Sequence, residues 1–222
     1  MGLDLINQYT AKILRAAQDG DSINRISKKT GISYAYTHEW ITKLEEENII
    51  HRKNGVHVSD QAVQEAFEDL AQTIITRGID LDTAYLLPNF AGRDYRFTKT
   101  DAVFFWTQGG YQIARNQDDY PIFIDVNEDE VEQWKRHFQS YGIETSVEER
   151  IQEGQPGIYY VLFPRQDFQT EWVENASVTP LQETVEWMQE YPANFQPALE
   201  MIDEIHDLDL DVTYREREVM GR

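Results

Sequence analysis

The chain has 222 residues, no cysteine and a formal net charge of −20, with 40 acidic against 20 basic side chains. This length predicts one large or two small domains, and a hydrophobic content of 41% is sufficient for a buried core. The lack of cysteine excludes disulfides and thiolate chemistry. No apolar run is long enough to span a membrane and the first residues lack the features of a signal peptide, so we expect a cytoplasmic protein with no membrane partner.

Residues 10–17 and 22–30 are predicted to form two short helices. In the second helix, isoleucines three residues apart form a buried side, and Ser22 can cap the first turn. Gly31 follows directly, where a left-handed backbone conformation favours glycine. The sequence therefore predicts a sharp turn before the next element.

A third helix is predicted to begin after Ser33, which can act as its cap. Apolar residues that include Trp40 and Leu44 recur at intervals of four and mark its buried stripe. Residues 49–52 and 56–58 follow as two short strands joined by Lys-Asn-Gly. Asn-Gly is the strongest short-range hairpin signal, because both turn positions tolerate positive φ.

This succession of helix, Gly-Ile-Ser turn, helix ending in Leu-Glu-Glu-Glu-Asn-Ile-Ile and basic Asn-Gly hairpin resembles the winged helix-turn-helix family of archaeal and bacterial transcription regulators. The resemblance covers residues 1–60. It implies that residues 33–45 read the major groove of double-stranded DNA and that residues 52–57 form a wing on phosphate or the minor groove. A protein-contact module with the same fold is the alternative. The side chains that the resemblance places on DNA are Arg25, Lys28, Lys29, Ser33, Tyr34, Tyr36, Thr37, His38, Lys43, Arg52, Lys53 and His57.

The charges are distributed unevenly along the chain. Residues 1–60 hold eight basic and eight acidic side chains, whereas the remaining residues hold 12 basic and 32 acidic ones. A neutral front end attached to an acidic remainder is typical of a nucleic-acid reader on a solvated body. The few lysines and the scattered acids favour a protein of an extreme halophile, with an acidic partner-binding surface as the alternative. At molar salt the Debye length is about 3 Å, so phosphate contacts would contribute less affinity than usual.

Residues 61–99 are expected to be a helix and a connector. Apolar residues repeat at intervals of three and four over residues 61–77 and predict one long amphipathic helix. Its apolar face would either pack back on residues 1–60 or pair with a second copy of the chain in a homodimer. Residues 79–98 contain proline, glycine and mixed polar residues, and we expect one strand near residues 95–97.

Residues 100–210 are predicted to form a mixed α/β domain that binds an effector or a partner, which gives the whole chain an α+β fold class. Residues 211–222 would be a charged tail. The expected elements are helical turns at 100–106 and 112–115, strands at 120–126, 143–147 and 158–163, and helices that begin near Asn127, Thr179 and Asn194.

Three residues mark the expected limits of helices in this domain. Asn127 follows a buried strand and can cap the helix after it. Thr179-Pro180-Leu-Gln182 predicts a capping box with proline in the first turn. Pro192 is expected to end the helix that starts there.

A second resemblance involves the C-terminal part of the chain. The order Gly-Gly-Tyr-Gln-Ile-Ala, Ile-Phe-Ile-Asp-Val, Tyr-Tyr-Val-Leu-Phe-Pro and Val-Thr-Pro-Leu-Gln resembles that of AbiEi-type antitoxins and related archaeal regulators. In that family a winged helix precedes an α/β domain, and the protein represses its own operon opposite a nucleotidyltransferase-like toxin. The resemblance implies an antitoxin-like autorepressor with a cognate toxin, or another protein, as partner.

A degenerate nucleotidyltransferase is a further alternative. Gly109-Gly110 precedes Asp125, but that chemistry needs two metal-binding carboxylates one residue apart, and the second position is Asn127. An amide binds Mg²⁺ less well than a carboxylate. The five histidines have no further ligands at metal-binding spacing. We therefore expect no enzyme, no catalytic or metal-ligating residues and no cofactor, and the sequence leaves an effector site in the second domain open.

Overall fold

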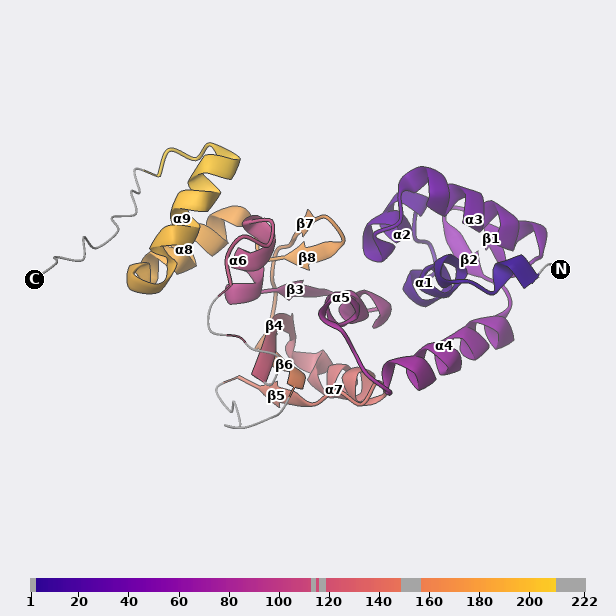
Figure 1. Ribbon diagram of the computed structural model, residues 1–222. Coiled ribbons are helices and arrows are strands. Elements are labelled where there is room, and N and C mark those ends of the chain that lie inside the picture. Colours follow the sequence, from indigo (N-terminus) through magenta and orange to yellow (C-terminus); the bar gives the residue numbers. More distant parts are fainter. Residues whose placement is uncertain (1–2, 113–114, 116–118, 149–156, 211–222) are drawn as a thin grey trace, which may run out of the picture.

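The computed structural model describes residues 3–112, 115, 119–148 and 157–210. A helical N-terminal part is followed by a part built on a mixed β-sheet, so the predicted α+β class is confirmed (Figure 1). We call residues 3–58 the head and residues 81–210 the body. The predicted tail lies outside the described residues.

The described head consists of helices followed by a two-stranded hairpin. Its elements are η1 (Leu3–Leu5), α1 (Gln8–Ala16), α2 (Ile23–Thr30), α3 (Tyr34–Glu46), β1 (Ile50–Arg52) and β2 (Val56–Val58). Asn7, Ser22 and Ser33 cap the three α-helices by accepting hydrogen bonds from backbone N–H groups of the first turns. Gly31 has a φ of 69°, so the turn between α2 and α3 forms as the sequence predicts.

One apolar core holds the head together. Its buried members come from all three α-helices and both strands, and include Ile13, Leu14, Ile26, Trp40, Ile41, Leu44, Ile49, Ile50 and Val56. The strands pair antiparallel, and Asn54 and Gly55 take positive φ values of 58° and 127° in the turn. A Cβ atom on Gly55 would lie 2.5 Å from the carbonyl of Gly20, so only glycine fits this position.

Helix α4 (Gln61–Ile75) leads from the head to the body. Asp60 caps it, Gln64 Nε2 donates to the Leu14 carbonyl at 3.0 Å, and Glu68 forms an ion pair with Arg15 at 2.7 Å. The predicted helix is therefore confirmed. None of its 15 residues is buried, however, so α1 covers its apolar face only in part.

The stretch expected to be a connector contains more regular structure than predicted. Helix α5 (Leu81–Leu86) and the 3₁₀ turn η2 (Leu87–Phe90) precede β3 (Tyr95–Phe97), which is the predicted strand. Asp80 caps α5 by accepting a hydrogen bond from the Thr83 N–H group at 2.8 Å. Six residues are too few for a helical repeat to be recognised, so the sequence does not predict α5.

The rest of the body comprises α6 (Thr100–Trp106), β4 (Asp119–Asn127), η3 (Glu128–Glu130), α7 (Val131–Gln139), β5 (Thr145–Val147), β6 (Gly157–Arg165), β7 (Glu171–Val173), β8 (Ala176–Val178), α8 (Leu181–Glu190) and α9 (Pro192–His206). The described strands form one mixed sheet in the order β5-β6-β4-β3-β8-β7. β4 is parallel to β6 and antiparallel to β3, while β3 and β8 are parallel. The antiparallel pair β7–β8, which the sequence does not predict, closes the edge of the sheet.

One face of the sheet carries the core of the body. Ile122 of β4 and Leu162 of β6 pack there with Trp134 and Phe138 of α7. The ring of Phe138 stacks on that of Tyr160, with 3.6 Å between the ring centroids. The strands predicted at 120–126, 143–147 and 158–163 are thus confirmed as β4, β5 and β6.

Several details of the predicted helices are wrong. Asn127 makes no capping hydrogen bond, because the 3₁₀ turn η3 intervenes before α7. Thr179 does not cap α8, since its hydroxyl donates to the Phe97 carbonyl at 3.1 Å and joins the end of β8 to β3. Helix α8 does end before Pro192 as predicted, but Pro192 is itself the first residue of α9, which was expected to begin near Asn194. Gln112 and Arg115 are not helical, and the two residues between them lie outside the described part of the chain.

His137 of α7 is held neutral inside the body. Its Nε2 atom lies 3.0 Å from the Leu87 carbonyl, and the rings of Trp134 and Tyr141 lie against it. Burial lowers the pKa of His137 from 6.5 to about 4. The unfolded chain therefore takes up this proton at a higher pH than the folded protein does. The contribution to stability is complete above the unfolded pKa and is lost as the pH falls through about 4.

We expect the free energy of unfolding to fall by about 2 kcal/mol between pH values of about 7 and about 5 because of the low pKa of His137. H137Q should remove most of this fall, whereas H38Q, at an exposed position of α3, should keep it. Urea unfolding at the two pH values measures the difference. An H137Q protein with the pH dependence of the unsubstituted chain would contradict the assignment.

Candidate nucleic-acid interface and an adjoining cleft

The N-terminal half of α3 presents a group of aromatic side chains to solvent. Tyr34 is 54% exposed and Tyr36 is 43% exposed, and Ser33 and His38 are also exposed. Tyr36 packs edge-on against Tyr9, with 5.0 Å between centroids, so one side of its ring is held by α1. The structure therefore brings four of the predicted contact residues together on one turn and a half of helix.

Two predicted contact residues are in the interior and are removed from this surface. Thr37 is fully buried, and its hydroxyl donates to the Ile32 carbonyl at 3.2 Å. Lys29 is buried in an ion pair with Asp21, at 2.7 Å, and also donates to the Ala16 carbonyl. Burial lowers the pKa of Lys29, and its hydrogen bond to Asp21 opposes that shift. Both side chains stabilise the head instead of facing a ligand.

Most of the predicted cations are already paired with acids. Lys43 lies 2.6 Å from Glu39, and Arg25 lies 3.3 Å from the Asp21 carboxylate. Arg52 binds Glu45 through its side chain and its backbone N–H group, which lowers the pKa of Glu45 and ties the hairpin to α3. His57 lies 3.4 Å from Asp19. Among the described residues, only Lys28 and Lys53 of the predicted cations have no ion pair.

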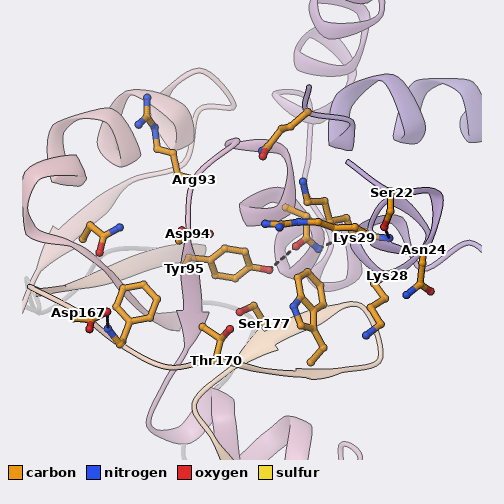
Figure 2. Close-up of a pocket in the computed structure, with 16 residues that line it drawn as sticks. Ser22, Asn24, Lys28, Lys29, Arg93, Asp94, Tyr95, Asp167, Thr170 and Ser177 are labelled. Carbon is orange, nitrogen blue, oxygen red and sulfur yellow. Dashed lines mark hydrogen bonds between the residues drawn. The ribbon is translucent and has the colours of Figure 1, made fainter. Parts of the chain in front are cut away.

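A cleft of about 510 Å³ lies between α2 of the head and the β3–β8–β7 edge of the body. In Figure 2, Ser22, Asn24 and Lys28 of the head lie on one side and Asp167 on the other, with Tyr95 and Ser177 between them. Arg25 and Lys28 therefore face the body as well as solvent, which the helical pattern of α2 does not reveal. No pattern in the sequence predicts this cleft.

Asn89 of η2 joins the head to the body at this cleft. Its amide Nδ2 donates to the Lys29 carbonyl at 2.9 Å and to the Asn175 carbonyl at 2.8 Å. Its Oδ1 accepts a hydrogen bond from the Tyr95 hydroxyl at 2.8 Å (dashed in Figure 2). The buried amide thus uses both donor hydrogens and its acceptor, and it connects α2, β3 and the turn between β7 and β8.

Asp125, the residue considered for metal chemistry, is occupied by arginine. It is completely buried, with Arg96 at 2.7 Å and Arg165 at 3.4 Å from its carboxylate oxygens. Arg96 also binds Glu183 at 2.6 Å. In the described part of the chain, no group of three or more histidine, aspartate or glutamate side chains is placed to hold a metal ion.

Comparison of the chain with models of protein families, with curated proteins and with solved structures finds no match. The described helices include none with the length and apolar character that crossing a bilayer requires.

Replacing Lys29 should damage the fold of the head. Lys29→Met leaves the Asp21 carboxylate buried with only Arg25 as a cationic partner, so we expect a loss of about 3 kcal/mol in the free energy of unfolding. Lys28→Met, at an exposed position without an ion pair, should change it by less than about 0.5 kcal/mol. Urea unfolding of the two variants tests this difference. Equal free energies of unfolding for the two variants would contradict the structural role of Lys29 in the interior of the head.

Proposed function

We propose that the head is a winged helix-turn-helix and that the protein is a DNA-binding transcription regulator, with α3 as the recognition helix and the β1–β2 hairpin as the wing. The observation that carries the proposal is the open face of α3. Tyr34 and His38 project from a capped helix that Trp40 and Leu44 anchor in the core, and the partly exposed Tyr36 lies at the edge of that anchored side. A helix held in this way can enter a major groove and contact base edges.

The small number of unpaired cations supports a DNA-binding protein whose affinity depends little on contacts to phosphate. Lys28 and Lys53 are the predicted contact cations without an ion pair among the described residues. Each phosphate contact contributes about −0.9 to the slope of log K against log salt, so two contacts give a slope of about −2 or less steep. Such a protein keeps its affinity at high salt, which agrees with the proposal of a halophilic source.

A protein-docking role for the same surface, with a toxin or another protein as partner, is the second candidate. It is favoured by the acid Glu46, which is exposed on α3 and repels phosphate. The antitoxin-like autorepressor combines both roles, because it binds an operator and a partner protein.

We expect the full chain to select a defined duplex from a random DNA library at molar KCl. Tyr34→Ala should weaken binding to that duplex by about tenfold to a hundredfold, because one good base contact contributes about 1–3 kcal/mol. Tyr191→Ala is the matched control, since Tyr191 is 49% exposed at the end of α8 in the body. Fluorescence anisotropy with the selected duplex measures both variants.

The two candidate functions give different outcomes in this experiment. Failure to enrich any duplex, or equal binding by Tyr34→Ala and the unsubstituted protein, would refute the DNA-reading role of α3. Recovery of a neighbour-encoded protein in a pull-down, with no DNA retained, would favour protein docking.

The apolar face of α4 supports a homodimer as the DNA-binding species. Leu70 and Ile74 are 49% and 58% exposed, and they line a largely apolar groove of about 580 Å³ between α1 and α4. Glu65 and Asp69 precede Leu70 on α4, whereas Arg77, which has no ion pair among the described residues, follows the end of the helix. Antiparallel pairing of two copies brings Arg77 of each chain toward these acids of the other, so we propose a second copy as the occupant.

Ile74→Glu should convert the dimer into a monomer, because it places a carboxylate in the centre of the apolar contact. Thr73→Glu adds the same charge to an exposed neighbouring position and should leave the dimer intact. Light scattering coupled to size-exclusion chromatography measures the mass of each variant. A monomeric unsubstituted protein over a wide concentration range would overturn this arrangement.

A further inference from the structure

The cleft between head and body carries opposite charges on its two sides. On the head side, Arg25, Lys28 and Lys29 share a single acid, Asp21, which leaves a net charge of +2. This cationic wall belongs to a chain whose net charge is −20, so it is an exceptional place for an anion to bind.

On the body side, Asp94 and Asp167 have no ion pair among the described residues. Arg93, the cation on this side, is already bound to Glu130 at 2.8 Å. A ligand that spans the cleft therefore needs an anionic group at the α2 end and hydrogen-bond donors at the Asp167 end.

Aromatic side chains form the walls between these two ends. Phe168 and Trp172 are half-buried and line the cleft, as does the buried Tyr95. The guanidinium of Arg96 lies 5.5 Å from the centre of the Phe168 ring and holds that ring in place. Such surfaces favour a flat ring on the ligand, because stacking of a base on an aromatic side chain contributes about 1–3 kcal/mol.

Ser177 adds a hydroxyl to the lining. The residue is 4% exposed and lines the cleft together with Tyr95. Figure 2 shows it beside Tyr95 in the middle of the lining. A hydroxyl at this position can donate a hydrogen bond to a ligand in the cleft or accept one from it.

We propose that the cleft binds a nucleoside monophosphate. The phosphate lies against Arg25 and Lys28, the base stacks in the Phe168–Trp172 region, and N–H groups on the edge of the base donate to Asp167. The volume of about 510 Å³ is within the range of small-molecule sites and excludes a nucleic-acid duplex. The inference goes beyond the proposed function, because binding of this ligand requires no DNA.

Other small ligands satisfy fewer of these groups. A lipid does not fit a lining in which asparagine, serine, threonine and charged side chains outnumber the aromatic ones. A sugar phosphate leaves the aromatic walls uncovered, and a free nucleoside leaves the two cations of α2 without an anion. A mononucleotide matches the cations, the rings and the acid together.

Isothermal titration of the full chain, without DNA, tests the proposal with GMP, AMP, CMP and UMP and with two fragments, guanosine and ribose 5-phosphate. At least one mononucleotide should bind about tenfold more tightly than either fragment, a difference of about 1.4 kcal/mol. Ribose 5-phosphate binding as tightly as the nucleotides would show a simple anion site. That result, or no binding of any nucleotide at millimolar concentration, would overturn the proposal.

Matched variants locate the ligand. Lys28→Ala should weaken nucleotide binding by about tenfold, because it removes a charge-assisted contact to phosphate. Lys53→Ala removes the same charge from an exposed position on the hairpin and should change the affinity by less than about twofold. Asp167→Asn should alter the order of preference among the four bases without loss of helical circular dichroism. Equal effects of Lys28→Ala and Lys53→Ala would refute binding in the cleft, whatever the outcome of the DNA selection.

Discussion

The buried amide of Asn89 determines how the two parts of the molecule are arranged. Its hydrogen bonds reach the end of α2, the Tyr95 hydroxyl and the turn after β7, at 2.8–2.9 Å. Loss of any partner would leave a buried polar group unsatisfied, at about 1–3 kcal/mol for each group. The head is therefore held in one orientation on the body. As a result the cationic side of α2 borders a cleft, while the aromatic side of α3 remains open to solvent.

A second connection restricts the same movement from the other side of the head. Arg15 of α1 binds Glu68 of α4 at 2.7 Å and the Tyr141 hydroxyl of the body at 2.6 Å. Because the head contacts the body at both Asn89 and Arg15, the head cannot easily rotate on the body about either contact. Any ligand that bridges α2 and the β7–β8 pair would act on an arrangement that is already fixed, so its binding energy is not spent on ordering the two parts.

The features that the sequence predicts correctly depend on neighbouring residues. Ser22, Gly31, Ser33 and the Asn54-Gly55 turn act through their own backbone angles and adjacent N–H groups, so short patterns reveal them. Thr179 satisfies the capping pattern equally well, but the Phe97 carbonyl, which comes from a strand far away in the sequence, takes its hydrogen bond. A short sequence pattern gives no information about a hydrogen-bond acceptor that comes from a distant part of the chain.

The candidate sites show the same limit. Helical periodicity separates the buried and exposed sides of α3 well enough to place Tyr34 and His38, but it assigns Lys29 to the surface. Lys29 is buried because Asp21, eight residues earlier, comes within 2.7 Å of it, and no repeat pattern contains that spacing. The two sides of the cleft are further apart still in the sequence, because one comes from α2 and the other includes Phe168 and Ser177. Counting charges along the chain locates the cations but not the face on which they lie.

The pairing of β3 with β8 has a consequence for the order of folding. Phe97 is aligned with Val178, so β3, an inner strand of the sheet, can pair with β8 only after the ribosome has added the residues of β8. The buried core of the head, by contrast, comes from residues 5–56, and domains with short sequence separation between contacts fold fast. The head can therefore be complete while most of the body is still being synthesised. In a partly synthesised chain, the side of α2 that later borders the cleft would then be exposed to solvent. It would remain exposed until the turn between β7 and β8 has been synthesised and has packed against the head.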